Sequence, residues 1–474
     1  MIIQSNAQNS SLNDLKPASP DTIQVVILSI NDQHSKIDNY GKLKALVDHI
    51  RSENKHVILL SAGDNFTGNP VVDQYHDKGF PVIDLMNLTG FHASAIGNHE
   101  FDYGQEILQK RINQAEFPFL SSNIRDQHGK RPFKPYELIR IDSSFLTIGI
   151  VSAIQLGVQG IPDSHPDNLK DLVFTDGIEE IRKLNSLRDS CTVFIALTHL
   201  GFEKDIELAL EVPELHLILG GHTHTLTKPS QQINGVQIMQ AGSNLRNLAK
   251  ATVSIVNGQV VKIKPEMLNI NDYPASDNKI EIKLAQFNDN KELNKVIGSS
   301  ATKITGNDEL GSLMTDAISA LESIDIAFQN NGGIRIDYLN AGDISIKNIY
   351  QLDPFGNEII VYKMKPAEIE TLIINSYRDA ENSLDLQVSG ITYTIITDTN
   401  NNPLKVDMRL PNGKKPARCK KYNVGMNSYI ASSYKFEHKD QGKSLYITTA
   451  ENLINYLKVN KDLNYQGVKR AFVK

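Results

Sequence analysis

Apolar residues in the first half of the chain gather in short runs that alternate with stretches of helical spacing. Residues 23–30 (IQVVILSI) are almost continuously apolar, which is typical of a strand buried on both faces. Leu43, Leu46, Val47 and Ile50 then recur at the spacing of one helix face. Further strands are predicted at 57–60, 93–96, 192–197 and 215–219, and further helices at 104–115 and 176–187. This alternation predicts a layered α/β fold.

The pattern changes after residue 268. Residues 269–300 are polar and charged, and they contain a helix-like stretch over 279–298, so we expect a linker and a connecting helix that also holds the hinge, within 279–300. Residues 301–474 form a second α/β pattern that opens with a helix. Because 474 residues exceed one ordinary core, we expect two domains, 22–268 and 301–474, after a disordered leader over 1–21.

Metal-ligand side chains follow five of the predicted strands directly. In a parallel sheet the carboxyl ends of the strands lie along one edge, so groups that are far apart in sequence can meet there. Each short motif alone is more often a polar turn than a ligand pair, and the ordered combination carries the prediction. The predicted metal ligands are Asp32, His34, Asp64, Asn98, His199, His222 and His224.

This set suits a centre with two divalent metal ions. Asp64 can bridge two cations through its two oxygens, Asn98 offers a neutral carbonyl oxygen, and the histidines offer imidazoles. Two cations about 3.5–4 Å apart can hold a phosphoryl group and acidify a bound water. The ligand types suit zinc or manganese first, and also iron or cobalt. The sequence therefore predicts a metal-dependent phosphoesterase.

His99 and Asp102 stand three residues apart at the start of a helical pattern, so their side chains can lie side by side. Asp102 would orient the imidazole and favour its charged form. His99 would then stabilise negative charge that develops in the reaction. We predict that this pair is catalytic.

Composition and charge narrow the function. The net charge of -6 argues against a nucleic-acid binder, so an anionic substrate needs local cations such as metals or arginines. Cys191 and Cys419 give no disulfide framework, and we expect Cys191 to be a buried free thiol. No apolar run approaches the length of roughly 18 residues that a membrane span needs. Residues 1–21 contain no apolar stretch like that of a signal peptide.

The motifs NDQH, GDN, GNHEFDYG, THLG and GGHTH together resemble the calcineurin-like metallophosphoesterases. They are most similar to the secreted 5′-nucleotidase and UDP-sugar hydrolase family, because NNGGIR, LDPFGNEIIVYKM and LQVSGITY in the second segment also fit. The resemblance implies a four-layer αββα catalytic domain, a linking helix and a smaller α/β substrate-binding domain. It also implies hydrolysis of nucleoside 5′-monophosphates by in-line attack of a metal-activated water.

The resemblance assigns roles to individual residues. It places Asp32, His34, Asp64 and His224 on one metal, and Asp64, Asn98, His199 and His222 on the other. In the second domain it implies that five residues contact the substrate, with two rings around the base and an arginine suited to phosphate. These residues are Asn330, Arg335, Phe355, Asn357 and Tyr429.

One departure leaves the substrate open. After its second aromatic residue the family usually has a Gly-Gly-Asp-Gly-Tyr stretch whose aspartate contacts ribose, whereas this chain has residues 431–438 (ASSYKFEH), and Glu437 or Asp440 would have to substitute. Alternatives on the same scaffold are a UDP-sugar or nucleoside diphosphate hydrolase, a 2′,3′-cyclic nucleotide phosphodiesterase and a sulfur-ester hydrolase. A non-catalytic surface binding protein is the alternative of another class.

The expected partner is a small-molecule nucleotide, with no nucleic acid and no membrane span, and the protein is expected to be a monomer or homodimer. The resemblance implies a periplasmic or secreted protein. The polar residues 1–21 leave a cytoplasmic location open.

Overall fold

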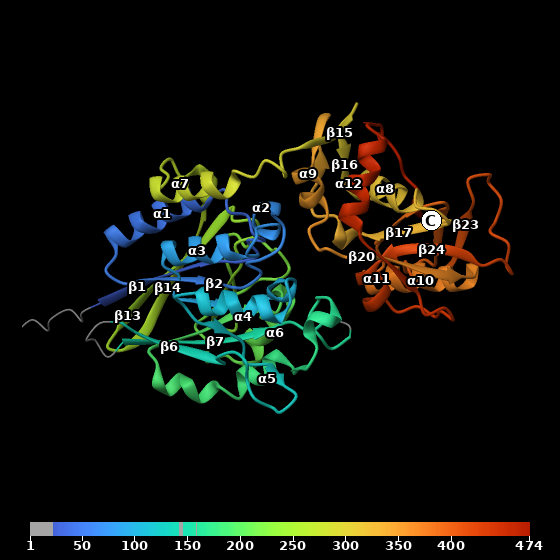
Figure 1. Ribbon diagram of the computed structural model, residues 1–474. Coiled ribbons are helices and arrows are strands. Elements are labelled where there is room, and N and C mark those ends of the chain that lie inside the picture. The colour runs from blue at the N-terminus through green and yellow to red at the C-terminus, as the bar shows by residue number, and fades with distance from the viewer. Residues whose placement is uncertain (1–21, 142–145, 158) are drawn as a thin grey trace, which may run out of the picture.

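The chain forms two α/β domains that lie side by side (Figure 1). The computed structural model describes residues 22–141, 146–157 and 159–474, so the leader predicted over 1–21 lies outside the described residues. In Figure 1 the first domain runs from blue to the yellow of α7 (Asn278–Asn288), the second runs from yellow-orange to red, and the chain after α7 passes between them. The predicted two-domain α/β class is confirmed.

Two six-stranded mixed sheets form the centre of the first domain. In spatial order the first sheet consists of β14 (Gln259–Asn269), β13 (Asn247–Val256), β1 (Thr22–Ile30), β2 (Val57–Ser61), β3 (Ala93–Ala95) and β4 (Phe119–Leu120). The second consists of β11 (Gln231–Ile233), β12 (Val236–Met239), β10 (Leu217–Leu219), β9 (Val193–His199), β7 (Leu146–Ile154) and β6 (Tyr136–Ile141).

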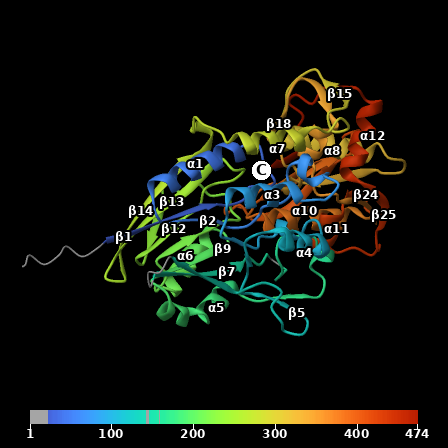
Figure 2. The same cartoon turned by 60° about the vertical axis from the view of Figure 1, so that its left-hand side comes forward.

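The two sheets pack face to face, and helices cover both outer faces. In β1, Val25 and Ile27 enter the core between the sheets, whereas Val26 and Leu28 enter the core under the helices. This alternation explains why the strand is apolar at nearly every position. Figure 2 shows α1 (Tyr40–Glu53) on one side of the sheets and α5 (Gly177–Arg182) on the other. The predicted four-layer αββα arrangement is therefore confirmed.

The structure has the predicted helices at 43–50 and 104–115, a shorter helix than predicted at 176–187, and three helices that were not predicted, namely α2 (Pro70–Asp73), α3 (Phe80–Thr89) and α6 (Phe202–Glu211). On the first sheet lie α1, α2, α3, α4 (Gln105–Gln114) and α7, and on the second lie α5 and α6. The helix predicted over 176–187 ends at Arg182 and is followed by the 3₁₀ turn η3 (Asn185–Ser190). Smaller elements are η1 (His99–Phe101), η2 (Pro166–Leu169), η4 (Ile270–Asp272), β5 (Ile124–Asp126) and β8 (Leu172–Phe174).

A five-stranded sheet with helices on both faces forms the core of the second domain. Its order is β21 (Leu386–Ser389), β17 (Ile326–Asn330), β24 (Tyr422–Asn427), β20 (Glu358–Met364) and β25 (Lys443–Thr448). Phe328 packs with Leu372 of α10 (Pro366–Asp379), and Ala327 packs with Ile318 of α8 (Gly306–Ser319), so these helices cover opposite faces.

Smaller sheets and helices complete the second domain. The sheets are β19 (Gly342–Ser345), β15 (Val296–Ser300) and β26 (Asp462–Leu463); β23 (Pro403–Arg409), β22 (Thr392–Thr397) and β27 (Ala471–Val473); and β16 (Ile304–Thr305) with β18 (Tyr338–Leu339). The remaining helices are η5 (Asn331–Gly333), α9 (Ile346–Leu352), α11 (Ser428–Ser433) and α12 (Thr449–Val459).

The connecting segment differs from the predicted helix over 279–298. Helix α7 ends at Asn288, and the following turn contains Asp289 and Asn290, residues that favour turns over helix interiors. Residues 296–300 then form β15, which pairs with β19 and β26. The domain limits at 268 and 301 and the hinge within 279–300 stay predictions.

Two expectations from composition can be compared with the structure. Among the described residues, no helix is both long enough and apolar enough to cross a membrane. Cys191 is a buried free thiol, as predicted, and Cys419 is exposed and also unpaired.

Candidate metal centre

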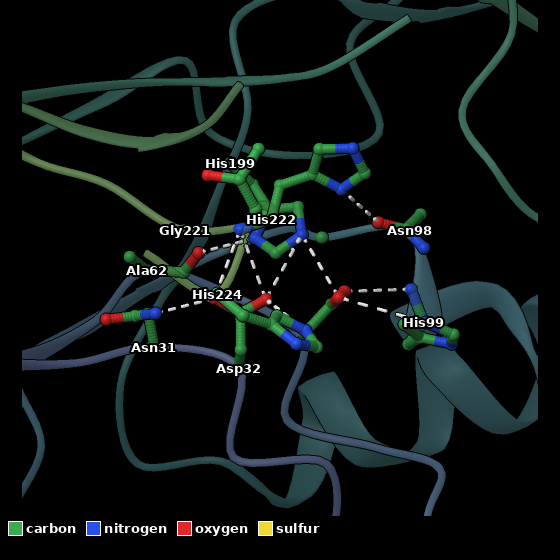
Figure 3. Close-up of polar contacts among 12 residues, drawn as sticks. Asn31, Asp32, Ala62, Asn98, His99, His199, Gly221, His222 and His224 are labelled. Carbon is green, nitrogen blue, oxygen red and sulfur yellow. Dashed lines mark hydrogen bonds and ion pairs between the residues drawn. The ribbon is translucent and has the colours of Figure 1, made fainter. Parts of the chain in front are cut away.

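The predicted ligands converge at one edge of the two sheets. Strands β1, β2 and β3 run parallel in the first sheet, as do β9 and β10 in the second, so their carboxyl ends point to the same edge. The loops after these strands bring the side chains together (Figure 3). The predicted convergence of Asp32, His34, Asp64, Asn98, His199, His222 and His224 is therefore observed.

The side-chain atoms of these residues face one another at short distances. The Nε2 atoms of His34 and His224 lie 2.9 Å apart, and Oδ1 of Asp32 lies 3.6 Å from the latter. These three residues form one group whose potential ligand atoms all lie within 4.8 Å of one another. The group coincides with most of the predicted first metal site.

Asp64 belongs to the remaining groups of potential ligands. It forms one with Asp32 and His199, and another with His34 and His99. Its Oδ2 lies 3.1 Å from Nε2 of His199. The predicted second site adds Asn98, whose Oδ1 lies 3.2 Å from Nδ1 of His222. The central position of Asp64 is the arrangement that a bridging carboxylate requires.

Most of the ligand loops have strained backbone conformations. Asp32, His34, Asp64, His222 and His224 all have positive φ angles, between 47° and 82°. Side chains other than glycine rarely occupy this region, and such strain clusters at functional sites. Backbone hydrogen bonds between the loops stabilise these strained conformations. One of them runs from the Asp32 N–H to the Gly63 carbonyl at 3.0 Å.

His199 shows that the residues fit a cation. Its Nδ1–H donates to the Ala62 carbonyl at 2.7 Å, which leaves Nε2 as the ligand atom. Nε2 is buried and no hydrogen bond to it is found within the described chain, although Oδ2 of Asp64 lies 3.1 Å away. A buried polar atom without a partner is costly, and a cation held with Asp64 would satisfy it.

Burial opposes charge on several of these groups. It raises the pKa of Asp32 to about 7, and it lowers the pKa of His222 to about 3 and that of His224 to about 4. For His199 burial also acts to lower the pKa, but Asp64 and Asp32 raise it to about 10. The neutral imidazoles of His222 and His224 are in the form that binds a metal.

His99 and Asp102 form the predicted pair beside the cluster. Nδ1 of His99 lies 2.6 Å from Oδ2 of Asp102, which directs Nε2 away from the pair. Burial acts to lower the pKa of His99, but Asp102 and Asp64 raise it above its ordinary value. The His99 backbone N–H donates to Oδ1 of Asp64 at 2.9 Å, so the pair is fixed to the candidate metal ligands.

A cavity of about 920 Å³ lies between the two domains and opens onto this cluster. Nη2 of Arg335 lies 3.4 Å from both ring nitrogens of His34, and the Phe355 ring stacks on His99 at 5.8 Å and 24°. All five predicted substrate residues line the cavity, namely Asn330, Arg335, Phe355, Asn357 and Tyr429. The structure thus brings both predicted sets together, while Asp32, His34 and His199 lie behind the cavity wall.

Glu100 is a buried residue of the site to which the sequence analysis assigned no role. Its carboxylate accepts the backbone N–H groups of Asp64, Asn65 and Gly97 at 2.6–3.0 Å and the Asn65 side-chain amide. It therefore holds the loop of Asp64 against the loop of Asn98. Its place within the GNHEFD motif was the available signal.

Three further residues had no signal in the sequence. Oδ2 of Asp163 lies 3.7 Å from Nε2 of His222, and the Asp163 carbonyl accepts from the Asn98 amide at 3.0 Å. His165 also lines the cavity. Buried Asp205 accepts from Thr198 at 2.6 Å and from Gln240 at 2.9 Å, beneath the loops of His199 and His222.

Comparison with known proteins agrees with the fold of both domains. The family described as "Calcineurin-like phosphoesterase" matches residues 25–226, and "5′-nucleotidase, C-terminal domain" matches residues 289–436. The 5′-nucleotidase precursor from Thermus thermophilus has the same fold, with a TM-score of 0.83, 24% identity, and coverage of 95% of this chain and 99% of that one.

Curated relatives match at lower coverage. The trifunctional nucleotide phosphoesterase protein YfkN of Bacillus subtilis (strain 168) is 28% identical over 86% of this chain and 32% of its own length. Protein UshA of Escherichia coli (strain K12) is 29% identical over 73% of this chain and 75% of its own length. The chain spans 32% and 39% of the first two curated relatives that it matches.

Proposed function

The chain belongs to the 5′-nucleotidase family of metallophosphoesterases, with a calcineurin-like domain followed by a 5′-nucleotidase C-terminal domain, and we propose from this that it hydrolyses nucleotide phosphate esters with bound divalent metal. The proposed substrates are nucleoside 5′-monophosphates, and the products are the nucleoside and phosphate. The observation that carries the proposal is a single cavity that is lined by four of the predicted metal ligands together with Arg335, Phe355 and Tyr429 of the second domain; the four are Asp64, Asn98, His222 and His224.

The proposed centre holds two divalent cations. Asp32, His34, Asp64 and His224 would hold one, and Asp64, Asn98, His199 and His222 would hold the other. When bound, these cations would supply positive charge for the phosphoryl oxygens and acidify the attacking water. The mixture of carboxylate, amide and imidazole ligands favours zinc or manganese.

His99 and Arg335 are the proposed contacts for charge on the reacting phosphate. Because Asp102 holds Nδ1 of His99, the Nε2–H group can donate to an oxygen that gains negative charge. Within the described chain no carboxylate forms an ion pair with Arg335, so its guanidinium donors are available to phosphate oxygens. Both groups line the cavity.

The proposed base contacts come from the second domain. The rings of Phe355 and Tyr429 both line the cavity, and each stacked base–aromatic contact typically contributes about 1–3 kcal/mol. Asn357 accepts from the Ser428 hydroxyl at 3.1 Å, which fixes the amide beside Phe355. The aromatic part of the cavity suits a flat, uncharged base, and the part with the metal ligands and Arg335 suits a phosphate.

A substrate panel with and without metal tests the proposal. Phosphate release would be measured from nucleoside 5′-monophosphates, a UDP-sugar, a nucleoside diphosphate, a 2′,3′-cyclic nucleotide and 4-nitrophenyl phosphate. We expect the highest kcat/KM with a nucleoside monophosphate, loss of all turnover after chelation, and recovery with zinc or manganese.

Two results would count against the proposal in different ways. Turnover of 4-nitrophenyl phosphate alone would support a metallophosphatase but remove the nucleotide substrate. Absence of turnover in protein with full metal content would favour the non-catalytic binding protein.

A further inference from the structure

A carboxylate that no family motif accounts for lines the nucleotide cavity in the second domain. Asp385 lies just before β21, and its side chain reaches both the large cavity and a neighbouring pocket of about 210 Å³. Glu437 and Asp440, the residues that the sequence offered as sugar contacts, line neither of these two cavities. Asp385, and not Glu437 or Asp440, is therefore the carboxylate that can reach a sugar in the cavity.

The hydrogen bonds of Asp385 hold it in place but leave acceptor positions unused. Its Oδ2 accepts from the hydroxyl of Tyr434, and its Oδ1 accepts from the backbone N–H of Asn331 at 3.2 Å. A carboxylate offers about four acceptor positions, so about two remain at the cavity. Only hydrogen-bond donors of a ligand can fill these two acceptor positions.

The contacts also place Asp385 between the two ends of the proposed substrate. Asn331 starts the turn η5, which leads to Arg335, the proposed phosphate contact. Tyr434 meets the ring of Tyr429, the proposed base contact, edge to face at 6.2 Å. Asp385 is thus joined to both neighbourhoods, and the part of a nucleotide between phosphate and base is the sugar.

The negative charge of Asp385 also favours contact with the sugar over contact with the phosphate. A carboxylate repels phosphate oxygens and accepts hydrogen bonds from neutral hydroxyl groups. A ribose presents two neighbouring hydroxyl donors, which match the unused acceptor positions of Asp385.

We propose that Asp385, oriented by Tyr434, binds the ribose hydroxyl groups and makes the protein selective for ribonucleotides over deoxyribonucleotides. The inference rests on the proposed nucleotide phosphoesterase function. Tyr434 is a positioning residue in it, because its hydroxyl donates to Asp385 and the side chain of Asn330 is within hydrogen-bonding reach.

The test compares kcat/KM for adenosine 5′-monophosphate with its 2′-deoxy and 3′-deoxy analogues, inosine 5′-monophosphate and 4-nitrophenyl phosphate. We expect the wild-type protein to prefer the ribonucleotide about 10- to 100-fold, the cost of losing a hydrogen bond to a charged group. Asp385→Asn should remove most of this preference by slowing the ribonucleotide, and Tyr434→Phe should reduce it partly. The matched control is Glu437→Gln, which removes a charge from an exposed side chain outside both cavities.

Each outcome has a separate meaning. The inference is overturned if nucleotides are hydrolysed but the ribose preference is absent or unchanged in Asp385→Asn. It is also overturned if the change in kcat/KM caused by Asp385→Asn depends on the base, so that it differs between adenosine and inosine monophosphates. Turnover of 4-nitrophenyl phosphate without any nucleotide turnover would instead refute the proposed function. Circular dichroism spectra that match that of the wild type would show that both variants are folded.

Discussion

Asp64 is the residue on which the candidate centre depends most. One of its oxygens accepts from the His99 backbone N–H at 2.9 Å, and the other lies 3.1 Å from Nε2 of His199. Asp64 is buried, so the positive charge that balances its carboxylate has to come from within the site. These contacts make Asp64 the proposed bridge between two cations.

We predict that Asp64→Asn lowers kcat by more than the 10- to 100-fold typical of residues that only orient a metal ligand. Asparagine has one acceptor oxygen in place of two, so it can no longer bridge. Metal content, measured by mass spectrometry after dialysis, should fall in the same variant. Circular dichroism should show a folded protein. Turnover equal to that of the wild type would contradict the bridging role.

His99 should behave differently because it is proposed to act on the substrate and not to hold metal. We predict that His99→Asn lowers kcat about 10²- to 10³-fold, the usual contribution of a donor that stabilises developing negative charge. Metal content should stay at the wild-type level. His128→Asn, at an exposed histidine, is the matched control and should leave kcat unchanged. A loss of metal in His99→Asn would make it a ligand instead.

At the scale of elements, strand order explains why so much of the site could be predicted. Each predicted ligand follows an apolar run, and β1, β2 and β3 turned out to be parallel neighbours. Parallel strands end at the same edge of a sheet, so residues that directly follow these strands could be predicted to lie close together. The covering helix α1 was also predictable, because it has a regular apolar face.

Contacts between distant loops could not be predicted in this way. Asp385 and Tyr434 are far apart in the sequence, and neither lies in a pattern that indicates a partner. Asp163 approaches His222 through an irregular loop without periodic apolar residues. Helix ends were also uncertain, as at Asn288, because turn-forming residues compete with the helix over one or two turns.

An ion pair that joins two elements of the second domain gives a prediction about stability. Asp316 of α8 accepts from both terminal nitrogens of Arg470, at 2.6 and 2.9 Å, and Arg470 precedes β27. Burial acts to raise the pKa of Asp316, but Arg470 and Ser389 lower it below its ordinary value. The pair therefore stabilises the fold above the unfolded pKa of aspartate, about 3.9, and this contribution is lost as the pH falls below it.

We predict that Asp316→Asn lowers the free energy of unfolding by about 1–2 kcal/mol at pH 7, because charged hydrogen bonds are lost at a partly exposed site. The difference from the wild type should shrink as the pH falls below about 4, because aspartate in the unfolded chain is then protonated, and it should vanish once native Asp316 is protonated at still lower pH. Urea unfolding followed by circular dichroism at the two pH values measures this. The exposed pair of Lys469 and Asp308 is the control, and Lys469→Gln should cost less than about 0.5 kcal/mol. A difference that does not depend on pH would rule out the ionic origin.

At the scale of the whole molecule, the cavity beside the candidate metal centre exists only because the domains meet. Ile346 and Tyr350 of the second domain pack against the apolar core of the first, and Gln159 donates to the Ser433 carbonyl across the boundary. These contacts bring Phe355 over His99. The first domain supplies the residues of the proposed chemistry, and the second supplies the residues that we propose select the substrate.

This division predicts that two substitutions in the second domain affect substrates differently. Phe355→Ala removes a ring proposed to stack on the base, so KM for a nucleoside 5′-monophosphate should rise roughly 5- to 100-fold. The kcat/KM for 4-nitrophenyl phosphate should change little, because that substrate has no base. Arg335→Ala removes a proposed phosphate contact, so kcat/KM should fall for both substrates. Steady-state kinetics on the two substrates separates these effects. If Phe355→Ala slowed both substrates equally, the ring would support His99 and not the base, and the second domain would belong to the chemistry as well as to recognition.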